Sequence, residues 1–197
     1  MSDAAREAIA EGGPPSAFFR EHESRLLASR SIGPTLDLAC GRGRHALAAA
    51  DLGLSVVALD RNRDALESLA RITPRPVEGG TGRIEIVCAD LESPSRPKLE
   101  VASFGAVLVF RYLHRPLFGW IEELVGPGGF VLYETFTEAQ TKLGWGPKRN
   151  DFLLRSGELA KLFPELVVEI YEEGPSNDDR SAQTARLLAS RPALATP

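Results

Sequence analysis

The chain has 197 residues, of which 43% are apolar and 25% charged, with a formal net charge of −4. This length fits one domain built around a single core, so we expect residues 1–197 to form one domain without a second. The acidic balance and the scattered lysines and arginines argue against a polyanionic partner, and we expect no nucleic acid to be bound. The charged N-terminus and the lack of any run of 18 apolar residues predict a cytoplasmic protein with no membrane contact.

The N-terminal part is predicted to be an arm followed by a helix. Residues 1–15 end in a Gly-Gly-Pro-Pro run, and we expect them to form a mobile arm. Ser16 is predicted to cap a helix that continues to about Ser29. An apolar strand at 35–39 and a helix at 45–52 follow.

The rest of the chain alternates between strand and helix patterns. Strands are predicted at 54–59, 84–89, 104–110, 130–134, 166–171 and 182–190, and helices at 62–71, 116–125 and 156–163. The alternation predicts an α/β fold, with a mostly parallel sheet and helices on both faces. By propensity alone 182–190 would equally suit a helix, but a short return strand there completes a seven-stranded sheet with an antiparallel edge. Residues 135–155 are predicted to be a lid loop.

The most informative stretch of the sequence is Leu36–His45, which places an apolar strand, an acid and a tight glycine turn directly before a helix. Gly41 and Gly43 lack a Cβ atom, so the backbone can turn with positive φ and a ligand can lie close against it. The start of the following helix offers unpaired N–H groups. This order of features predicts a site for a nucleotide-type cofactor.

Two further acids follow the next two strands. Asp60 ends the predicted strand at 54–59, and Asp90 ends the predicted strand at 84–89. Together with Asp37 they would place three carboxylates along the sheet edge where open α/β sheets bind ligands. Asp60 stands where an acid can accept hydrogen bonds from a ribose.

The glycine spacing alone also satisfies the loose dinucleotide fingerprint, so a small nicotinamide-dependent oxidoreductase is an alternative. Against it, Asp37 lies four residues before Gly41, where its charge would oppose a pyrophosphate, and the chain offers no second substrate domain. S-adenosylmethionine carries an amino group, a ribose and an adenine but no phosphate, which suits three acids better. A non-catalytic module that only binds the cofactor is a third hypothesis.

Several motifs resemble those of class I S-adenosylmethionine-dependent methyltransferases. These are the segments 36–44, 58–60, 88–91 and 127–129, and the resemblance covers roughly residues 34–135. The segments 43–46, 110–117, 133–136 and 149–154 are similar to the tellurite-resistance-type branch of small bacterial methyltransferases and extend the match to about residue 190. The resemblance implies a Rossmann-like sheet of seven strands in the order 3-2-1-4-5-7-6, with an antiparallel last strand.

The resemblance also implies which residues hold S-adenosylmethionine and release S-adenosylhomocysteine. Gly41 and Gly43 would lie under the methionine part, Asp60 would bind the ribose hydroxyls, and Asp90 would meet the adenine amino group. Arg61 and Leu91 would flank the adenine ring. The full set expected at the cofactor is Asp37, Ala39, Gly41, Gly43, Arg44, Asp60, Arg61, Asp90, Leu91 and Phe110.

In this architecture the residues after the strand at 104–110 face the transferred methyl group. We expect an in-line transfer to a small, anionic or polarisable acceptor, with catalytic roles for His114, Arg111 and Tyr112. His114 would take a proton near neutral pH, and Arg111 would bind an anion. Further residues expected at the acceptor are Arg115, Tyr133, Arg149 and Phe152. An alternative for His114 and Arg115 is that they brace the helix begun by Pro116.

Cysteine and histidine usage argues against metal or disulfide chemistry. The two cysteines, Cys40 and Cys88, end apolar strands, and both are expected to be small buried core residues. The three histidines have no ligand-like spacing, so no metal site is expected. We expect a monomer or a homodimer.

Overall fold

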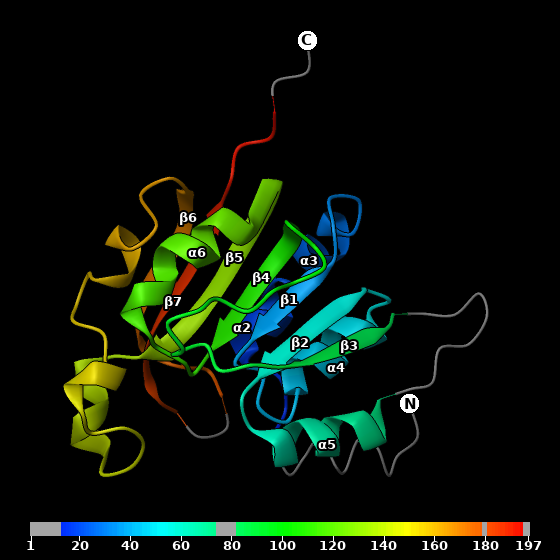
Figure 1. The fold of residues 1–197 in the computed structure, drawn as a ribbon. Helices are drawn as coiled ribbons and strands as arrows, with labels where there is room; N and C mark the ends of the chain where they lie inside the picture. The colour runs from blue at the N-terminus through cyan, green and yellow to red at the C-terminus, as the bar shows by residue number, and fades with distance from the viewer. Residues whose placement is uncertain (1–12, 74–81, 179–180, 195–197) are drawn as a thin grey trace.

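The computed structural model describes residues 13–73, 82–178 and 181–194. Its centre is a seven-stranded sheet in the order β3-β2-β1-β4-β5-β7-β6 (Figure 1). The strands are β1 (Thr35–Leu38), β2 (Val56–Asp60), β3 (Ile84–Cys88), β4 (Phe104–Phe110), β5 (Val125–Phe136), β6 (Val167–Pro175) and β7 (Gln183–Ser190). Strands β1 to β5 pair in parallel, whereas β7 is antiparallel to both neighbours. The predicted fold class and strand order are confirmed.

Helices cover both faces of the sheet. The helices are α2 (Ala17–Glu21), α3 (Glu23–Ser29), α4 (Arg44–Asp51), α5 (Arg63–Ile72) and α6 (Phe118–Leu124). Short 3-10 turns are η1 (Arg115–Leu117), η2 (Glu138–Leu143), η3 (Asn150–Phe152) and η4 (Leu159–Lys161). Helix α6 packs on one face with the segment around η4, and α2 to α5 pack on the other (Figure 1).

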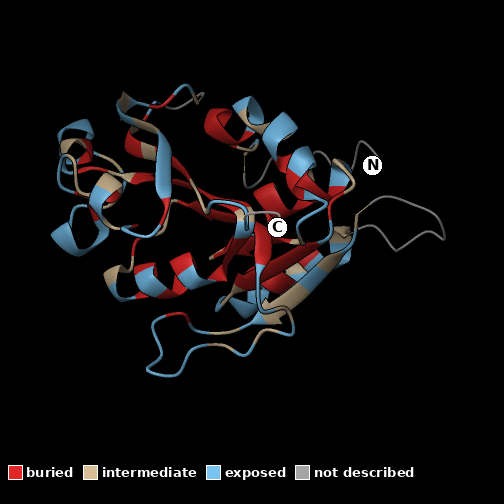
Figure 2. Cartoon of the chain, turned by 90° about the horizontal axis from the view of Figure 1, so that it is seen from above, coloured by how far each residue is buried: buried red, intermediate tan, exposed pale blue. Residues whose placement is uncertain are grey.

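The core therefore consists of two apolar layers separated by the sheet. All seven residues of β4 are buried, and their side chains divide between the two layers. Val107 and Val109 belong to the layer under α6, whereas Leu108 and Phe110 belong to the layer under α2 to α5. Figure 2 shows the buried residues concentrated in the strands between the helix layers. A strand buried on both faces needs the continuous apolar run that this segment has.

The N-terminal helix differs from its prediction. Ser16 caps it as expected, because its Oγ accepts a hydrogen bond from the N–H of Phe19 at 3.1 Å. The helix does not continue to Ser29, however, since α2 ends at Glu21 and α3 begins at Glu23. His22 between them leaves helical geometry with φ −113°, and its Nδ1 lies 2.8 Å from the carbonyl of Phe18. Two short helices thus replace the single predicted one.

Other segments also differ from their predictions. Strand β5 begins at Val125, because Val125 already pairs with Phe104 across the irregularity formed by residues 126–129. The helix predicted at 116–125 starts as the 3-10 turn η1, and the one predicted at 156–163 is reduced to η4. The segment 135–155 is not a plain loop, since it contains η2, η3 and a bridge between Thr137 and Leu154.

The two cysteines have different environments. Cys40 is buried as expected, but Cys88 is exposed, so that part of the prediction was wrong. The physical reason is the position of β3 at the edge of the sheet, where it pairs only with β2 and is at best partly covered.

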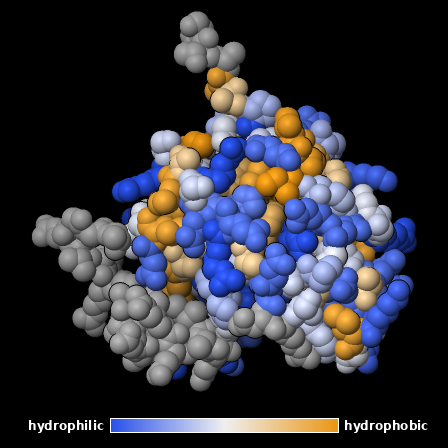
Figure 3. All heavy atoms as spheres, turned by 180° about the vertical axis from the view of Figure 1, so that it is seen from behind, coloured by the Kyte–Doolittle hydropathy of each residue, from blue (hydrophilic) through white to orange (hydrophobic). Residues whose placement is uncertain are grey.

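Within the described ranges, none of the helices combines the length and the apolar character that a membrane span requires. Seen from behind, the surface mixes hydrophilic side chains with separate apolar patches (Figure 3). The exposed large hydrophobic residues include Leu27, Ile32, Val167 and Val168.

Candidate functional site

The carboxyl ends of β1 and β4 border a cavity of about 600 Å³, and a smaller pocket of about 150 Å³ lies beside it. Ala39 lines both, so the two spaces meet at the residue that follows β1. The larger cavity is lined by Gly13, Pro14, Asp37, Ala39, Cys40, Gly41, Arg42, Arg44, His45, Phe110, Arg111, Trp145 and Asp178. The smaller pocket is lined by Ala39, Asp60, Arg61, Ala89, Asp90, Leu91, Glu92 and Tyr112.

The glycine turn lies between β1 and α4 and has three left-handed residues, Ala39 with φ 55°, Gly41 with φ 55° and Gly43 with φ 77°. A Cβ atom on Gly41 would meet no atom within 4 Å, and Gly41 lines the larger cavity. A Cβ atom on Gly43 would lie 2.5 Å from Cδ1 of Leu69 in α5. Gly41 therefore leaves room for a ligand, whereas Gly43 lets the start of α4 pack against α5. The left-handed φ of Ala39 could not be anticipated, because an alanine gives no signal for it.

Asp37 ends up behind the turn. It is 1% exposed, and its Oδ2 accepts a hydrogen bond from the N–H of Ala46 in α4 at 2.9 Å. Burial raises the pKa of its carboxyl to about 7, although the Ala46 N–H and the charge of Arg44 oppose this shift. Asp37 thus fixes the start of α4 and borders the cavity in a form that gains a proton near neutral pH.

Asp60 joins the glycine turn to the smaller pocket. Its Oδ2 accepts from the N–H of Gly41 and its Oδ1 from the N–H of Asn62, both at 2.8 Å. Since it also lines the smaller pocket, one carboxylate both shapes the turn and borders a space for a ligand.

The smaller pocket brings together five residues that the sequence predicts at the cofactor, namely Ala39, Asp60, Arg61, Asp90 and Leu91. Nη1 of Arg61 lies 3.7 Å from the Asp90 carboxylate and 3.5 Å from that of Glu92. Tyr112 closes the same pocket, and no described residue forms a hydrogen bond with its buried hydroxyl. Burial raises the pKa of this phenol. The structure therefore places Tyr112 with the predicted adenine residues, in a different pocket from Arg111.

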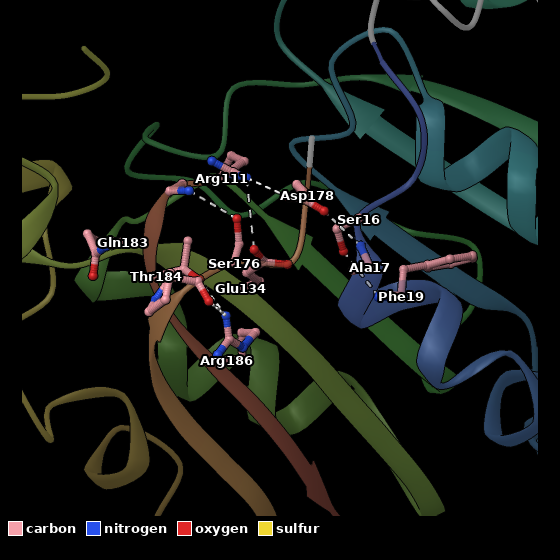
Figure 4. A network of polar contacts seen from close by, with 12 residues as sticks. Ser16, Ala17, Phe19, Arg111, Glu134, Ser176, Asp178, Gln183, Thr184 and Arg186 are labelled. Carbon is pink, nitrogen blue, oxygen red and sulfur yellow. Dashed lines mark hydrogen bonds and ion pairs between the residues drawn. The ribbon is translucent and has the colours of Figure 1, made fainter. Parts of the chain in front are cut away.

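Arg111 lies at the cavity directly after β4 and is the centre of a polar network (Figure 4). Its backbone has a left-handed φ of 60°, and its N–H donates to the carbonyl of Glu134 at 2.8 Å. Its Nη2 donates to Oδ2 of Asp178 at 2.8 Å, and the guanidinium stands over the ring of Phe136 at 4.7 Å. A non-glycine residue held in this conformation is typical of functional sites.

Asp178 comes after β6 in the sequence, and it lies at the cavity because of the way the chain folds. Its second oxygen, Oδ1, accepts from the N–H of Ala17 at 2.8 Å, so one carboxylate connects Arg111 to the start of α2. No motif marks this aspartate, and sequence analysis does not find it. The signal that could have found it is the hairpin of β6 and β7, which returns the chain to the edge where β4 and β5 end.

Glu134 lies behind Arg111 at the end of β5. It is 1% exposed, and neither carboxylate oxygen has a hydrogen-bond partner within the part of the chain that is described. The nearest cation is Nη2 of Arg111, at 3.9 Å from Oε1. Burial raises the pKa of Glu134, and the charge of Arg111 opposes this rise.

His45 in α4 also borders the cavity, although it lies outside the predicted set. Its ring stacks on Phe110 with a centroid distance of 3.8 Å, and its Nε2 accepts from the N–H of Ser16 at 3.2 Å. Burial holds its pKa well below the usual value, so the imidazole is neutral. Its nearness to the glycine turn is the only sign of this role in the sequence.

Four residues expected to act on the acceptor lie elsewhere. His114, Arg115, Arg149 and Phe152 border another depression, of about 300 Å³, which shares Glu92 with the smaller pocket. Nε and Nη2 of Arg115 donate to the two carboxylate oxygens of Glu158 at 2.6 and 2.9 Å, and Nη2 also donates to the carbonyl of Leu153. These contacts favour the bracing role for Arg115.

Tyr133 also lines neither the cavity nor the smaller pocket. It is buried in the layer under α6, where its ring stacks on Phe118 at 5.3 Å. Its hydroxyl donates to the carbonyl of Tyr112 at 2.9 Å. Of the described side chains, no three His, Cys, Asp or Glu gather closely enough to hold a metal ion.

Comparisons with known proteins agree with this geometry. Residues 35–129 match the family described as a methyltransferase domain, and no curated protein matches the chain. TehB from Haemophilus influenzae has a similar structure, with a TM-score of 0.63 and 20% identity over 86% of this chain and 62% of that chain. This chain therefore spans less than two thirds of the TehB chain.

Two further solved structures share the fold over nearly their whole length. The glycopeptide N-methyltransferase MtfA, complexed with sinefungin, has a TM-score of 0.63 and 18% identity, covering 91% of this chain and 87% of that chain. An S-adenosylmethionine-dependent methyltransferase from Mesorhizobium loti has a TM-score of 0.60 and 19% identity, covering 83% of this chain and 96% of that chain. The glycine turn and the acids Asp37, Asp60 and Asp90 thus lie within the segment that matches the methyltransferase-domain family, and these similarities support S-adenosylmethionine as the cofactor.

Proposed function

We propose that this protein transfers a methyl group from S-adenosylmethionine to a small, anionic or polarisable acceptor by in-line displacement. The observation that carries this proposal is the pair of spaces that meet at Ala39, one bordered by Asp60 and Asp90 and the other by Arg111. The acid-lined pocket suits a nucleoside, and the larger cavity has room for a second molecule. The motifs at 110–117, 133–136 and 149–154 support placing the chain in the tellurite-resistance-type branch.

The residues present fit this cofactor. The open space over Gly41 leaves room for its methionine part, and the carboxylates of Asp60 and Asp90 can accept from ribose hydroxyls and an adenine amino group. Arg61 and Leu91 border the same pocket and would flank the base. In the larger cavity, Asp37 would face the amino group and Arg44 the carboxylate of the methionine part.

When bound, S-adenosylmethionine supplies an electrophilic methyl group on a sulfonium. The protein contributes position and a dry environment, since a transfer of this kind needs no covalent enzyme intermediate. Phe110 and Trp145 give the cavity an apolar wall, and Arg111 offers the cation that would hold the acceptor. Trp145 belongs to the segment 135–155, which we therefore propose as the lid that excludes water.

Removing the Asp60 carboxylate tests this assignment. We expect Asp60→Ala to weaken the binding of S-adenosylhomocysteine by about 1 to 3 kcal/mol, the scale of losing charge-assisted hydrogen bonds. Isothermal titration calorimetry measures the change. Asp64→Ala is the matched control, because Asp64 is an exposed acid in the first turn of α5 and lines neither the cavity nor the smaller pocket. An unchanged affinity in Asp60→Ala would remove Asp60 from the site.

A further inference from the structure

The guanidinium of Arg111 is held incompletely by the protein. Asp178 contacts it through one oxygen only, because its other oxygen accepts from the N–H of Ala17. Nε of Arg111 is buried and has no hydrogen-bond partner among the residues that the structure describes. Glu134 forms only a long ion pair with Arg111, because its Oε1 lies 3.9 Å from Nη2, beyond hydrogen-bond distance. Figure 4 marks this contact with a dashed line. Arginine binds a carboxylate most strongly when both oxygens face two of its N–H groups.

A ligand carboxylate could therefore bind Arg111 better than Asp178 does. It would offer two oxygens to the guanidinium, whereas Asp178 offers one. The Asp178 side chain is 17% exposed and borders the cavity, so a ligand in the cavity can reach the contact. Displacing Asp178 leaves its carboxylate bonded to the N–H of Ala17, which limits the cost of the exchange.

The charges around the cavity favour an anion. Two arginines, Arg44 and Arg111, line it together with two acids, Asp37 and Asp178. Burial raises the pKa of Asp37 to about 7, so this acid carries only part of its charge near neutral pH. These four side chains therefore carry a net positive charge near neutral pH, which attracts an anionic ligand and raises its rate of association.

Glu134 does not reverse this balance. It is buried without a hydrogen-bond partner among the described side chains, and burial favours its protonated form. Arg186 pairs with Glu134 in register on β7, but its donors point to Glu172, to Thr184 and to the carbonyl of Pro175. Of Arg111, Glu134 and Arg186, it is Arg111 that lines the cavity and offers its positive charge there.

The other cavity walls favour an apolar body on the ligand. Phe110 stacks on the neutral ring of His45, and both line the cavity together with Trp145. Phe136 holds the guanidinium of Arg111 from its flat face, which leaves the edge of the guanidinium for a planar group. A bare inorganic oxyanion would use Arg111 but not these rings.

We propose that Arg111 determines the specificity for the methyl acceptor, and that the acceptor is an organic acid with an apolar body whose carboxylate replaces Asp178 on the guanidinium. This inference rests on the proposed function, because it assigns the second molecule of the methyl transfer. It assigns the carboxylate as the group of the acceptor that Arg111 recognises, and it does not assign which atom receives the methyl group.

Benzoate is a suitable probe, tested on the full chain saturated with S-adenosylhomocysteine. We expect saturable binding in a ligand-observed NMR titration, and no comparable binding of benzamide, which has the same shape without the charge. Arg111→Gln should weaken benzoate binding by about tenfold or more. Asp178→Asn should strengthen it several-fold, because the competing carboxylate is gone. Arg96→Gln is the matched control, since Arg96 is exposed, pairs with Glu123 and lines neither the cavity nor the smaller pocket.

Other outcomes would overturn the inference. Equal binding of benzoate and benzamide would show that the cavity does not recognise the carboxylate charge. Weaker benzoate binding in Asp178→Asn would exclude Asp178 as a competitor. Binding of inorganic phosphate without benzoate would exclude the apolar body, and preferred binding of benzylamine would make the acceptor a cation. Asp178→Asn is expected to strengthen benzoate binding, so the inference can still be tested if Arg111→Gln fails to fold. Failure of S-adenosylhomocysteine itself to bind would instead contradict the proposed function.

Discussion

Gly41 and Gly43 are two positions apart in the sequence, but the structure requires glycine at each for a different reason. We expect Gly43→Ala to destabilise the fold by about 2 to 4 kcal/mol, because a left-handed alanine and a Cβ atom 2.5 Å from Leu69 both add cost. Gly41→Ala shares the left-handed conformation but meets no atom, so it should cost about 1 kcal/mol. Thermal unfolding of both variants measures the difference.

The same two variants separate packing from binding. Gly41→Ala places a methyl group at the cavity and should weaken the binding of S-adenosylhomocysteine more than its small loss of stability would suggest. Equal stability of the two variants would contradict the packing role of Gly43.

The raised pKa of Asp37 predicts a pH-dependent stability. The folded state binds this proton up to about pH 7, whereas the unfolded chain releases it near its ordinary pKa of 3.8. The stabilisation is therefore complete below pH 3.8 and is lost as the pH rises to about 7. Relative to Asp37→Asn, the wild type should lose roughly 2 to 3 kcal/mol of unfolding free energy between pH 5 and pH 8.

Urea unfolding at the two pH values checks this prediction. The amide introduced by Asp37→Asn would keep an oxygen for the N–H of Ala46, so the variant removes the titration and preserves the contact to α4. Asp51→Asn is the control, because Asp51 is exposed at the end of the same helix. Identical pH dependence in the wild type and Asp37→Asn would show that Asp37 titrates normally.

At the scale of single residues, the sequence predicts those site residues that belong to local motifs. Asp60, Asp90 and the glycine turn stand at strand ends that an apolar run reveals, and the structure brings them to adjoining spaces. Asp178 and His45 join the site through hydrogen bonds to the start of α2, and no local sequence pattern predicts such long-range contacts. Arg115 looks like a ligand-binding cation in the sequence because its partner Glu158 lies 43 residues away.

At the scale of elements, Arg115 ties the segment containing η3 and η4 to the turn after β4. Besides Glu158, its guanidinium contacts the carbonyls of Asp151 and Leu153. We expect Arg115→Ala to lower the unfolding free energy by about 1 kcal/mol, since both side chains are partly exposed and water screens the pair. The affinity for S-adenosylhomocysteine should stay unchanged.

Thermal unfolding, limited proteolysis of the segment 137–158 and calorimetric titration test this bracing role together. Arg149→Ala is the matched control, because its ion pair with Asp151 is fully at the surface and should contribute little. A loss of S-adenosylhomocysteine binding in Arg115→Ala with unchanged stability would place Arg115 at the site after all.

Strands were easier to predict than helices in this chain. The central strands β1, β2 and β4 are apolar runs buried between covering layers, and a run of that kind is visible locally. The helix ends depend on tertiary contacts instead. His22 interrupts the predicted first helix where its ring packs on Phe18, and α6 is preceded by the 3-10 turn η1, which begins at Arg115.

At the scale of the whole molecule, the strand order explains why residues far apart in the chain form one site. The parallel pairing of β1 with β2 and β4 brings the carboxyl ends of these strands to the same edge. The antiparallel hairpin of β6 and β7 then adds Asp178 to that edge from the end of the chain. The sheet thereby places the acids of the smaller pocket beside the arginines of the cavity.

Calorimetric titration of the full chain with S-adenosylhomocysteine, and in parallel with NADH and NADPH, tests the methyltransferase assignment most directly. We predict saturable binding of S-adenosylhomocysteine alone, in the micromolar range and with a free energy on the order of −8 kcal/mol. Binding of a nicotinamide cofactor alone would contradict it, and would assign the cavity and the smaller pocket to hydride transfer instead.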